Sequence, residues 1–267
     1  MVISLHKINL NQKQLRTDLI MEQNLRQKKE KTITKNQTIE VTETSIGEND
    51  YTTINFKDIT DKGNFKKVQE SFVNELKKYL KLTKKDRIII IGLGNDKCTP
   101  DSLGPLTIEN ILVTRHLFLL GEVEEGYSNV SSFIPNVMGN TGIETSEIIK
   151  CIVKEIKPTK VIVIDSLKTN NIERLAKTIQ ITNQGISPGS GIGNKRKEIS
   201  KKTINAEVIA IGIPLVVDIS SLANKINKEM IVTPTNIDLL VEKLSLLIGN
   251  GINISLHENF IRQNNCK

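Results

Sequence analysis

Aromatic residues are nearly absent from this chain of 267 residues. They make up 3% of it, and tryptophan does not occur. The core must therefore be built from Ile, Leu and Val. No aromatic side chains interleave with the basic stretches to stack nucleic-acid bases. The formal net charge of +7 is thus interpreted as a lysine-rich solvated surface, and we expect no direct nucleic-acid partner.

Cysteine and histidine are also scarce, with three of each. Cys98, Cys151 and Cys266 lack metal-type spacing, and no His-Glu-x-x-His sequence is present, so we expect neither structural disulfides nor a zinc-protease site. The first residues show no signal-peptide pattern, and no apolar run approaches the length of a membrane span. These absences predict a cytoplasmic protein without a membrane partner.

The order of the patterned segments predicts the fold class. Residues 1–37 are polar and basic and are typical of a flexible arm or a removable leader. Two Thr- and Ile-rich segments then predict a small β-hairpin over residues 38–60. Further on, buried aliphatic runs alternate with segments of helical periodicity, which indicates an α/β fold with a mostly parallel sheet. The expected strands are Arg87–Leu93, Val161–Ile164, Thr178–Thr182 and Val208–Ile213, and the expected helices are Phe65–Leu82, Pro105–Leu120, Glu144–Ile156, Asn171–Ala176 and Ile237–Ile248.

Two aspartates lie where such a sheet gathers its reactive groups. Asp165 directly follows one expected strand, and Asp101 lies in the loop after another. In open α/β sheets, ligands bind beyond the carboxyl ends of the strands, so the two carboxylates can converge over one crevice. Close carboxylates cannot both ionise cheaply, and such a pair can activate water and protonate a leaving amine. For each residue taken alone, helix capping is the commoner role.

A glycine-rich loop, residues 185–197, is the third candidate feature. It contains Gly189, Ser190, Gly191 and Gly193, and glycine lets backbone N–H groups approach a bound anion or oxyanion. The loop matches neither a P-loop nor a dinucleotide fingerprint. A substrate-contacting or oxyanion-binding loop and a solvated turn are both open interpretations.

Several motifs together resemble the germination protease family of spore-forming bacteria. They include Thr99-Pro-Asp-Ser-Leu-Gly-Pro105, Val163-Ile-Asp-Ser-Leu167 and the long stretch Gly185–Glu198. Val232-Thr-Pro234 and the segment from Asn250 to Glu258 match the end of the family pattern. The match runs from the leader to about Glu258, and its length makes chance similarity improbable.

This resemblance implies a fold, an activity and a processing step. The implied fold is a three-layer α/β/α type, as in hydrogenase-maturation endopeptidases. The implied activity is an endopeptidase, without a cofactor, that degrades small acid-soluble spore proteins at germination in the spore core, with catalytic groups falling on Asp101 and Asp165. The family is made as a zymogen, assembles as a homotetramer and removes its own leader. The cut matches Asp18–Leu19, which divides the chain into a leader, 1–18, and a protease domain, 19–267.

The segment after Leu222 departs from the family pattern, because it is shorter than usual before the Val-Thr-Pro element. Two alternatives remain open. In the first, the protease is kept and Asp101 and Asp165 are ligands of a catalytic divalent metal, since carboxylates are hard ligands. In the second, which the shorter segment motivates, the chain is a degenerate, non-catalytic paralogue that binds spore proteins.

Overall fold

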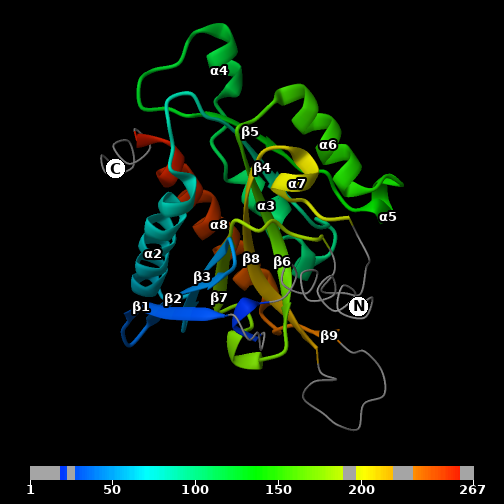
Figure 1. Ribbon diagram of the computed structural model, residues 1–267. Coiled ribbons are helices and arrows are strands. Elements are labelled where there is room, and N and C mark those ends of the chain that lie inside the picture. The colour runs from blue at the N-terminus through cyan, green and yellow to red at the C-terminus, as the bar shows by residue number, and fades with distance from the viewer. Residues whose placement is uncertain (1–18, 23–27, 189–196, 219–230, 259–267) are drawn as a thin grey trace, which may run out of the picture.

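The computed structural model describes residues 19–22, 28–188, 197–218 and 231–258. In this part of the chain, a nine-stranded sheet runs in the order β1-β2-β3-β7-β8-β6-β4-β5, with β9 paired to β8 (Figure 1). The strands are β1 (Lys29–Lys35), β2 (Ile39–Ile46), β3 (Asn49–Phe56), β4 (Arg87–Gly92), β5 (Asn129–Phe133), β6 (Lys160–Thr169), β7 (Thr178–Thr182), β8 (Glu207–Asp218) and β9 (Ile231–Val232). The helices are α2 (Lys62–Leu80), α3 (Leu103–Glu109), α4 (Arg115–Leu120), α5 (Met138–Thr141), α6 (Thr145–Ile156), α7 (Lys201–Ile204) and α8 (Ile237–Leu256), with 3-10 turns η1 (Ile20–Glu22), η2 (Thr99–Asp101) and η3 (Ile172–Arg174).

The sheet is mixed rather than mostly parallel. Strands β5, β4, β6 and β8 are parallel neighbours, whereas β1, β2, β3, β7 and β9 join by antiparallel pairing. The parallel strands are the continuous aliphatic runs, as expected when both faces of a strand are covered. The error in the prediction comes from the Thr-rich strands, which join the sheet through the antiparallel pairing of β3 with β7, a strand distant in sequence.

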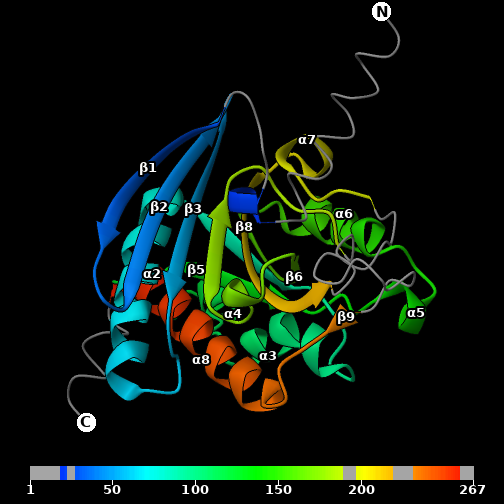
Figure 2. The same cartoon turned by 90° about the horizontal axis from the view of Figure 1, so that it is seen from below.

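Each face of the sheet carries its own hydrophobic cluster. One cluster combines α2, α3 and α8 with side chains such as Ile90, Ile162 and Ile211. The other combines α6 and α7 with the alternate residues, such as Ile91, Val163 and Ala210. Figure 2 shows α3 and α8 on one side of the sheet and α6 and α7 on the other. The alternation follows from the two-residue period of a strand.

The amino-terminal strands are part of the main sheet and not a separate appendage. Strands β2 and β3 pair antiparallel from Ile39↔Phe56 to Ile46↔Asn49. Gly47 begins the connecting turn with φ of 62°, a left-handed conformation that glycine adopts without strain. β3 then pairs with β7, which ties these strands to β8. The additional strand β1, within a region expected to be a flexible arm, extends the sheet at this edge.

The helix expected over Pro105–Leu120 is wrong in one respect, because it is two helices, α3 and α4. The chain leaves α3 at Asn110, where the side chain of Asn253 in α8 accepts from the Leu112 amide (2.9 Å) and donates to the Asn110 carbonyl (2.8 Å). This buried amide satisfies backbone groups that a continuous helix would have paired internally. The sequence pattern contains no sign of so distant a partner.

Two strands are longer than predicted. β6 continues past Ile164 to Thr169, so Asp165 lies within the strand and not directly after it. β8 continues through Pro214 to Asp218, although proline cannot donate a ladder hydrogen bond. The two extensions pair with each other, with a register irregularity between Leu167 and Lys168.

Helix α8 has the length and composition of a membrane span, contrary to the prediction that no such run exists. Its mean hydropathy reaches 1.3, but 61% of that window is buried inside the structure. It packs against α2 and α3. Its apolar character is therefore accounted for by its place in the core.

His257, at the end of α8, is fully buried and is held as a neutral ring. Its Nδ1 accepts from the Ser128 amide (3.2 Å), and its Nε2 faces the Leu112 carbonyl at 3.2 Å. A proton on Nδ1 would point at an N–H donor. Burial lowers the pKa of His257 below its usual 6.5, and the Leu112 hydrogen bond only partly opposes this.

This lowered pKa predicts a loss of stability in mild acid. Below pH 6.5 the unfolded chain takes up a proton at His257 that the folded chain resists, so the free energy of unfolding falls as pH decreases from about 6.5. We expect His257→Gln to show a flatter dependence on pH between 7 and 5, measured by urea denaturation. His116→Gln is the matched control and should keep the wild-type slope. Parallel curves for wild type and H257Q would contradict this assignment.

Candidate active site

Asp165 lies in the middle of the parallel part of the sheet. It belongs to β6, between β4 and β8, and is 4% exposed. The Ser166 amide donates to its Oδ1 at 2.9 Å. Because side chains alternate along a strand, Asp165 points to the same face as Val163 and Leu167. This carboxylate is therefore set at the end of an apolar surface, where electrostatic interactions are stronger than in water.

Asp101 is held by the loop that follows β4. It ends the 3-10 turn η2, where its amide donates to the Cys98 carbonyl (2.8 Å) and its carbonyl accepts from the Asn95 amide (3.0 Å). Gly94 has φ of 115°, and a Cβ placed there would lie 1.9 Å from the Asp101 carbonyl oxygen and 3.3 Å from its Cγ. The Asp101 backbone carbonyl therefore lies against Gly94, where only glycine leaves room, and the Asp101 carboxyl group lies nearby.

The β4–β6 pairing brings these two segments to one edge of the sheet. Gly92 pairs with Ile164, and the Leu93 amide donates to the Ile164 carbonyl at 2.8 Å. Asp165 is the next residue on β6, and Gly94 is the next residue after Leu93. η2 also packs against β6 and β8. Both candidate aspartates thus lie at the carboxyl end of neighbouring parallel strands, 64 residues apart in sequence.

The predicted substrate-contacting residues Gly189, Ser190, Gly191 and Gly193 lie outside the described residues. The two flanks of their loop are described. Ile186 and Ile199 form an antiparallel bridge with reciprocal hydrogen bonds of 2.9 and 2.7 Å. Both side chains are buried in the cluster on the Asp165 face of the sheet. The glycine-rich loop therefore begins and ends on that face.

The predicted processing site is described on one side only. Asp18 lies outside the described residues, whereas Leu19 is fully buried in the cluster on the Asp165 face. The residues that sequence reasoning missed are those that hold this segment. Gln180, Thr169 and Arg174 contact Ile20 and Glu22. These contacts join residues about 150 positions apart in sequence, so they depend on the long-range fold.

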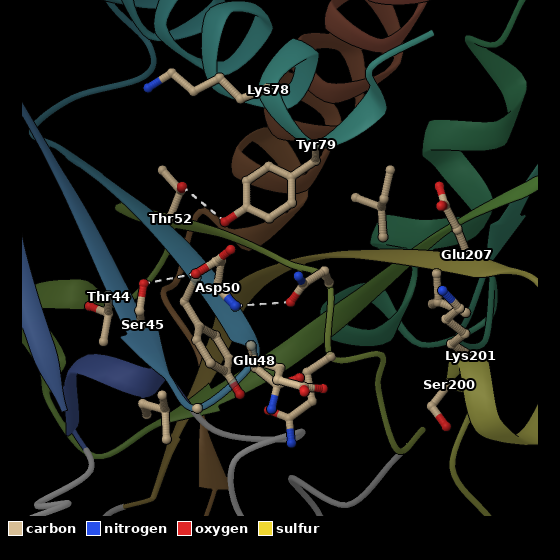
Figure 3. A pocket seen from close by; sticks show the side chains of 18 of the residues that line it. Thr44, Ser45, Glu48, Asp50, Thr52, Lys78, Tyr79, Ser200, Lys201 and Glu207 are labelled. Carbon is tan, nitrogen blue, oxygen red and sulfur yellow. Dashed lines mark hydrogen bonds between the residues drawn. The ribbon is translucent and has the colours of Figure 1, made fainter. Parts of the chain in front are cut away.

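A large cavity lies at the amino ends of β6 and β8, the opposite end of these strands from the aspartates. Its volume is about 1150 Å³, and it is lined by the turn between β2 and β3 and by the first residues of β6, β8 and α7 (Figure 3). Lysine and acidic side chains mix along its walls, and Lys160 pairs with Glu207 at 2.5 Å. Neither Asp101 nor Asp165 lines it. The cavity is thus a feature separate from the candidate carboxylates.

Within the described ranges, no group of three or more His, Cys, Asp or Glu side chains is placed to hold a metal ion. Cys98, three residues before Asp101, is an exposed free thiol. Cys151 is also free and exposed, and Cys266 lies outside the described residues.

Comparison with known proteins gives a consistent set of similarities. A family model described as "Germination protease" matches residues 3–227. Curated proteins named "Germination protease" from Geobacillus sp. (strain WCH70) and Bacillus velezensis are each 53% identical over 163 residues, and one from Bacillus cereus (strain AH187) is 52% identical over the same length. These alignments cover 59% of this chain and 44% of each relative, so the chain spans less than half the length of these relatives.

Close backbone contact between Gly92 and Gly104 predicts that substitution of either glycine destabilises the fold beside the site. A Cβ on Gly104 in α3 would lie 2.2 Å from the Leu93 carbonyl oxygen, and one on Gly92 would lie 2.4 Å from the Gly104 carbonyl oxygen. We expect Gly104→Ala to lower the free energy of unfolding by about 1–3 kcal/mol, because backbone atoms must move apart. The measurement is urea denaturation.

Gly139→Ala is the control for this substitution. Gly139 lies in α5, and nothing lies within 4 Å of its Cβ position. Its replacement should leave stability unchanged or slightly higher, since alanine favours helix. Equal stability of G104A and G139A would contradict the close packing of α3 on β4.

Proposed function

Because the chain belongs to the germination protease family, we propose that it is an endopeptidase that initiates the degradation of small acid-soluble spore proteins at germination. The observation that carries the proposal is the common position of Asp101 and Asp165 at the carboxyl ends of β4 and β6, within the matched region 3–227. We infer that the protein acts in the spore core, without a cofactor. By family resemblance, we also propose a homotetramer and a three-layer α/β/α domain over 19–267.

The proposed mechanism uses one carboxylate and one carboxylic acid. The ionised aspartate takes a proton from a water molecule as its oxygen attacks the peptide carbonyl. The tetrahedral intermediate then collapses, and the protonated aspartate gives its proton to the leaving amine. Two neighbouring carboxyl groups favour this division because ionising both is costly. Asp165 is almost fully buried, where electrostatic interactions are stronger than in water.

The glycine-rich loop has a supporting role in this proposal. Backbone N–H groups of Gly189, Ser190, Gly191 and Gly193 would stabilise the oxyanion or bind the substrate backbone. The anchoring of both loop flanks on the Asp165 face supports this role.

The first test is replacement of each aspartate by its amide. Asp101→Asn and Asp165→Asn should each lower kcat/KM by about 10²- to 10⁴-fold, since each removes a proton acceptor or donor. The assay is cleavage of a purified small acid-soluble spore protein by leader-removed chain. Asp96→Asn changes an exposed aspartate of the same loop and should keep full activity.

The outcomes of this assay separate the alternatives. Full activity in D101N or D165N would remove that residue from the mechanism. Loss of activity on metal stripping, with recovery on adding a divalent ion, would favour the metal-dependent alternative. Binding of the spore protein without cleavage by wild type would favour the non-catalytic paralogue.

The second test concerns the proposed self-processing at Asp18–Leu19. An acidic residue before the cut resembles the acidic-then-apolar motif of the substrate proteins. We expect Asp18→Ala to abolish or relocate leader removal and Asp18→Glu to retain it, as measured by intact mass after incubation. An unchanged cut in D18A would count against an acidic requirement at this position.

A further inference from the structure

The segment Leu19–Glu22 is seated on the sheet like a bound peptide. Leu19 and Ile20 are both fully buried, although they lie near the start of the chain. In Figure 1 the segment is the short blue turn just below the β7 label. The Ile20 amide donates to the Gln180 Oε1 at 2.7 Å, a buried hydrogen bond between residues 160 positions apart.

Gln180 relates this segment to Asp165. In the strand register, Gln180 of β7 pairs with Gly212 of β8, and Gly212 pairs with Asp165 of β6. Residues in register on adjacent strands point to the same face, so the Gln180 and Asp165 side chains flank a position without a side chain. Two strand spacings separate them, about 10 Å. The Ile20 amide is therefore bound to a side chain that lies two strands away from the candidate carboxylate.

Apolar contacts receive the first two side chains of the segment. Leu19 joins the cluster that contains Leu93 and Leu167 on the Asp165 face. Ile20 packs with Tyr51 of β3 and with Ile46 at the end of β2. These contacts give two adjacent apolar subsites.

The fourth residue of the segment is held by its charge. Glu22 accepts from the Thr169 hydroxyl and, at 2.8 Å, from the Asn170 amide. The Arg174 guanidinium lies 3.3 Å from the Glu22 Oε1, and the Glu22 side chain is only 9% exposed. Two donors and one cation around a single carboxylate form a carboxylate clamp, defined here as Thr169, Asn170 and Arg174.

We propose that the surface holding Leu19–Glu22 is the substrate subsite on the carboxyl side of the scissile bond. It takes peptides with apolar residues at the first and second positions after the cut and a carboxylate at the fourth. In this chain its own segment occupies the subsite, and substrates compete with that segment for it. The inference rests on the proposed cut after Asp18 and names Thr169 and Arg174 as specificity-determining residues.

A binding experiment tests the subsite without relying on cleavage. The probes are a fluorescein-labelled peptide of residues 19–24, Leu-Ile-Met-Glu-Gln-Asn, and its analogue with Gln at the fourth position. Binding to the full chain is followed by fluorescence polarisation. Glu22→Gln removes the negative charge that the clamp binds while keeping the shape of the side chain, so the chain's own segment is held less tightly. It should bind the Glu peptide about tenfold more tightly than wild type does, and about tenfold more tightly than the Gln peptide, since hydrogen bonds to charged groups are strong.

Two further variants complete the test. Glu173→Gln makes the same chemical change on the neighbouring turn, outside the clamp, and should bind like wild type. Arg174→Gln, added to Glu22→Gln, should remove the preference for the Glu peptide. Circular dichroism checks that each variant is folded. Arg174 lies on the partly exposed η3, and R174Q alone should also bind the Glu and Gln peptides equally.

Equal binding of the Glu and Gln peptides by E22Q would overturn the proposal, as would binding no tighter than that of wild type and E173Q. In either case the segment would be a structural tether only. The binding assay is independent of the cleavage assay. If the peptides bind as expected but the chain cuts no spore protein, the subsite is supported and the proposed function is rejected. If the chain cuts the spore protein but the peptides do not bind as expected, the proposed function is supported and the subsite is rejected.

Discussion

The contact between glycine backbones at the end of β4 determines how the candidate site is assembled. Gly92 and Leu93 lie against Gly104 at distances that exclude any Cβ, and Gly94 lies equally close to Asp101. The two ends of the loop after β4 are therefore packed tightly against the strand end, whereas its tip at Asp96–Cys98 is exposed. In the same stretch, the Leu93 amide continues the hydrogen bonding of β4 to β6 at Ile164. One short segment thus fixes η2 on one side and Asp165 on the other.

Apolar side chains cover most of the face of the sheet that carries Asp165. Gly212 leaves space beside Asp165, and the Leu167 side chain leans over that space, within 2.5 Å of where a Cβ would lie. An extended chain crossing this edge meets apolar contacts first and the carboxylate clamp later. The same arrangement buries Leu19 and holds Glu22, so in the proposed subsite a substrate would use the residues that hold the chain's own segment.

The sequence predicted the parts of this structure that depend on local pattern. The aliphatic run of β4 and the periodic helices α2 and α6 are confirmed, because a buried strand and an amphipathic helix each leave a clear signature. The break between α3 and α4 was missed, since it depends on Asn253 from the far end of the chain. The mixed sheet was missed for a similar reason: the pairing of β3 with β7 joins segments more than a hundred residues apart.

For the site, residue type and strand position indicated Asp101 and Asp165, whose catalytic role stays a prediction. The carboxylate clamp gave no signal of its own, because Thr169, Asn170 and Arg174 are ordinary polar residues at the end of β6 and in the segment that follows it. Their chemistry depends on Glu22, which lies 147 positions from Thr169 and is brought there only by the fold.

Covalent attachment explains how a segment as short as Leu19–Glu22 can occupy the proposed subsite. A free peptide of four residues loses its translational freedom on binding and gains few contacts, so its affinity is weak. The same four residues joined to the chain bind at an effective concentration in the millimolar range or above, depending on the length and stiffness of the connection. A subsite too weak to retain a released product can therefore stay filled by its own chain. A substrate protein must then present more than these four residues in order to displace it. This competition therefore favours partners that make contacts beyond these four residues, and it requires no additional pocket.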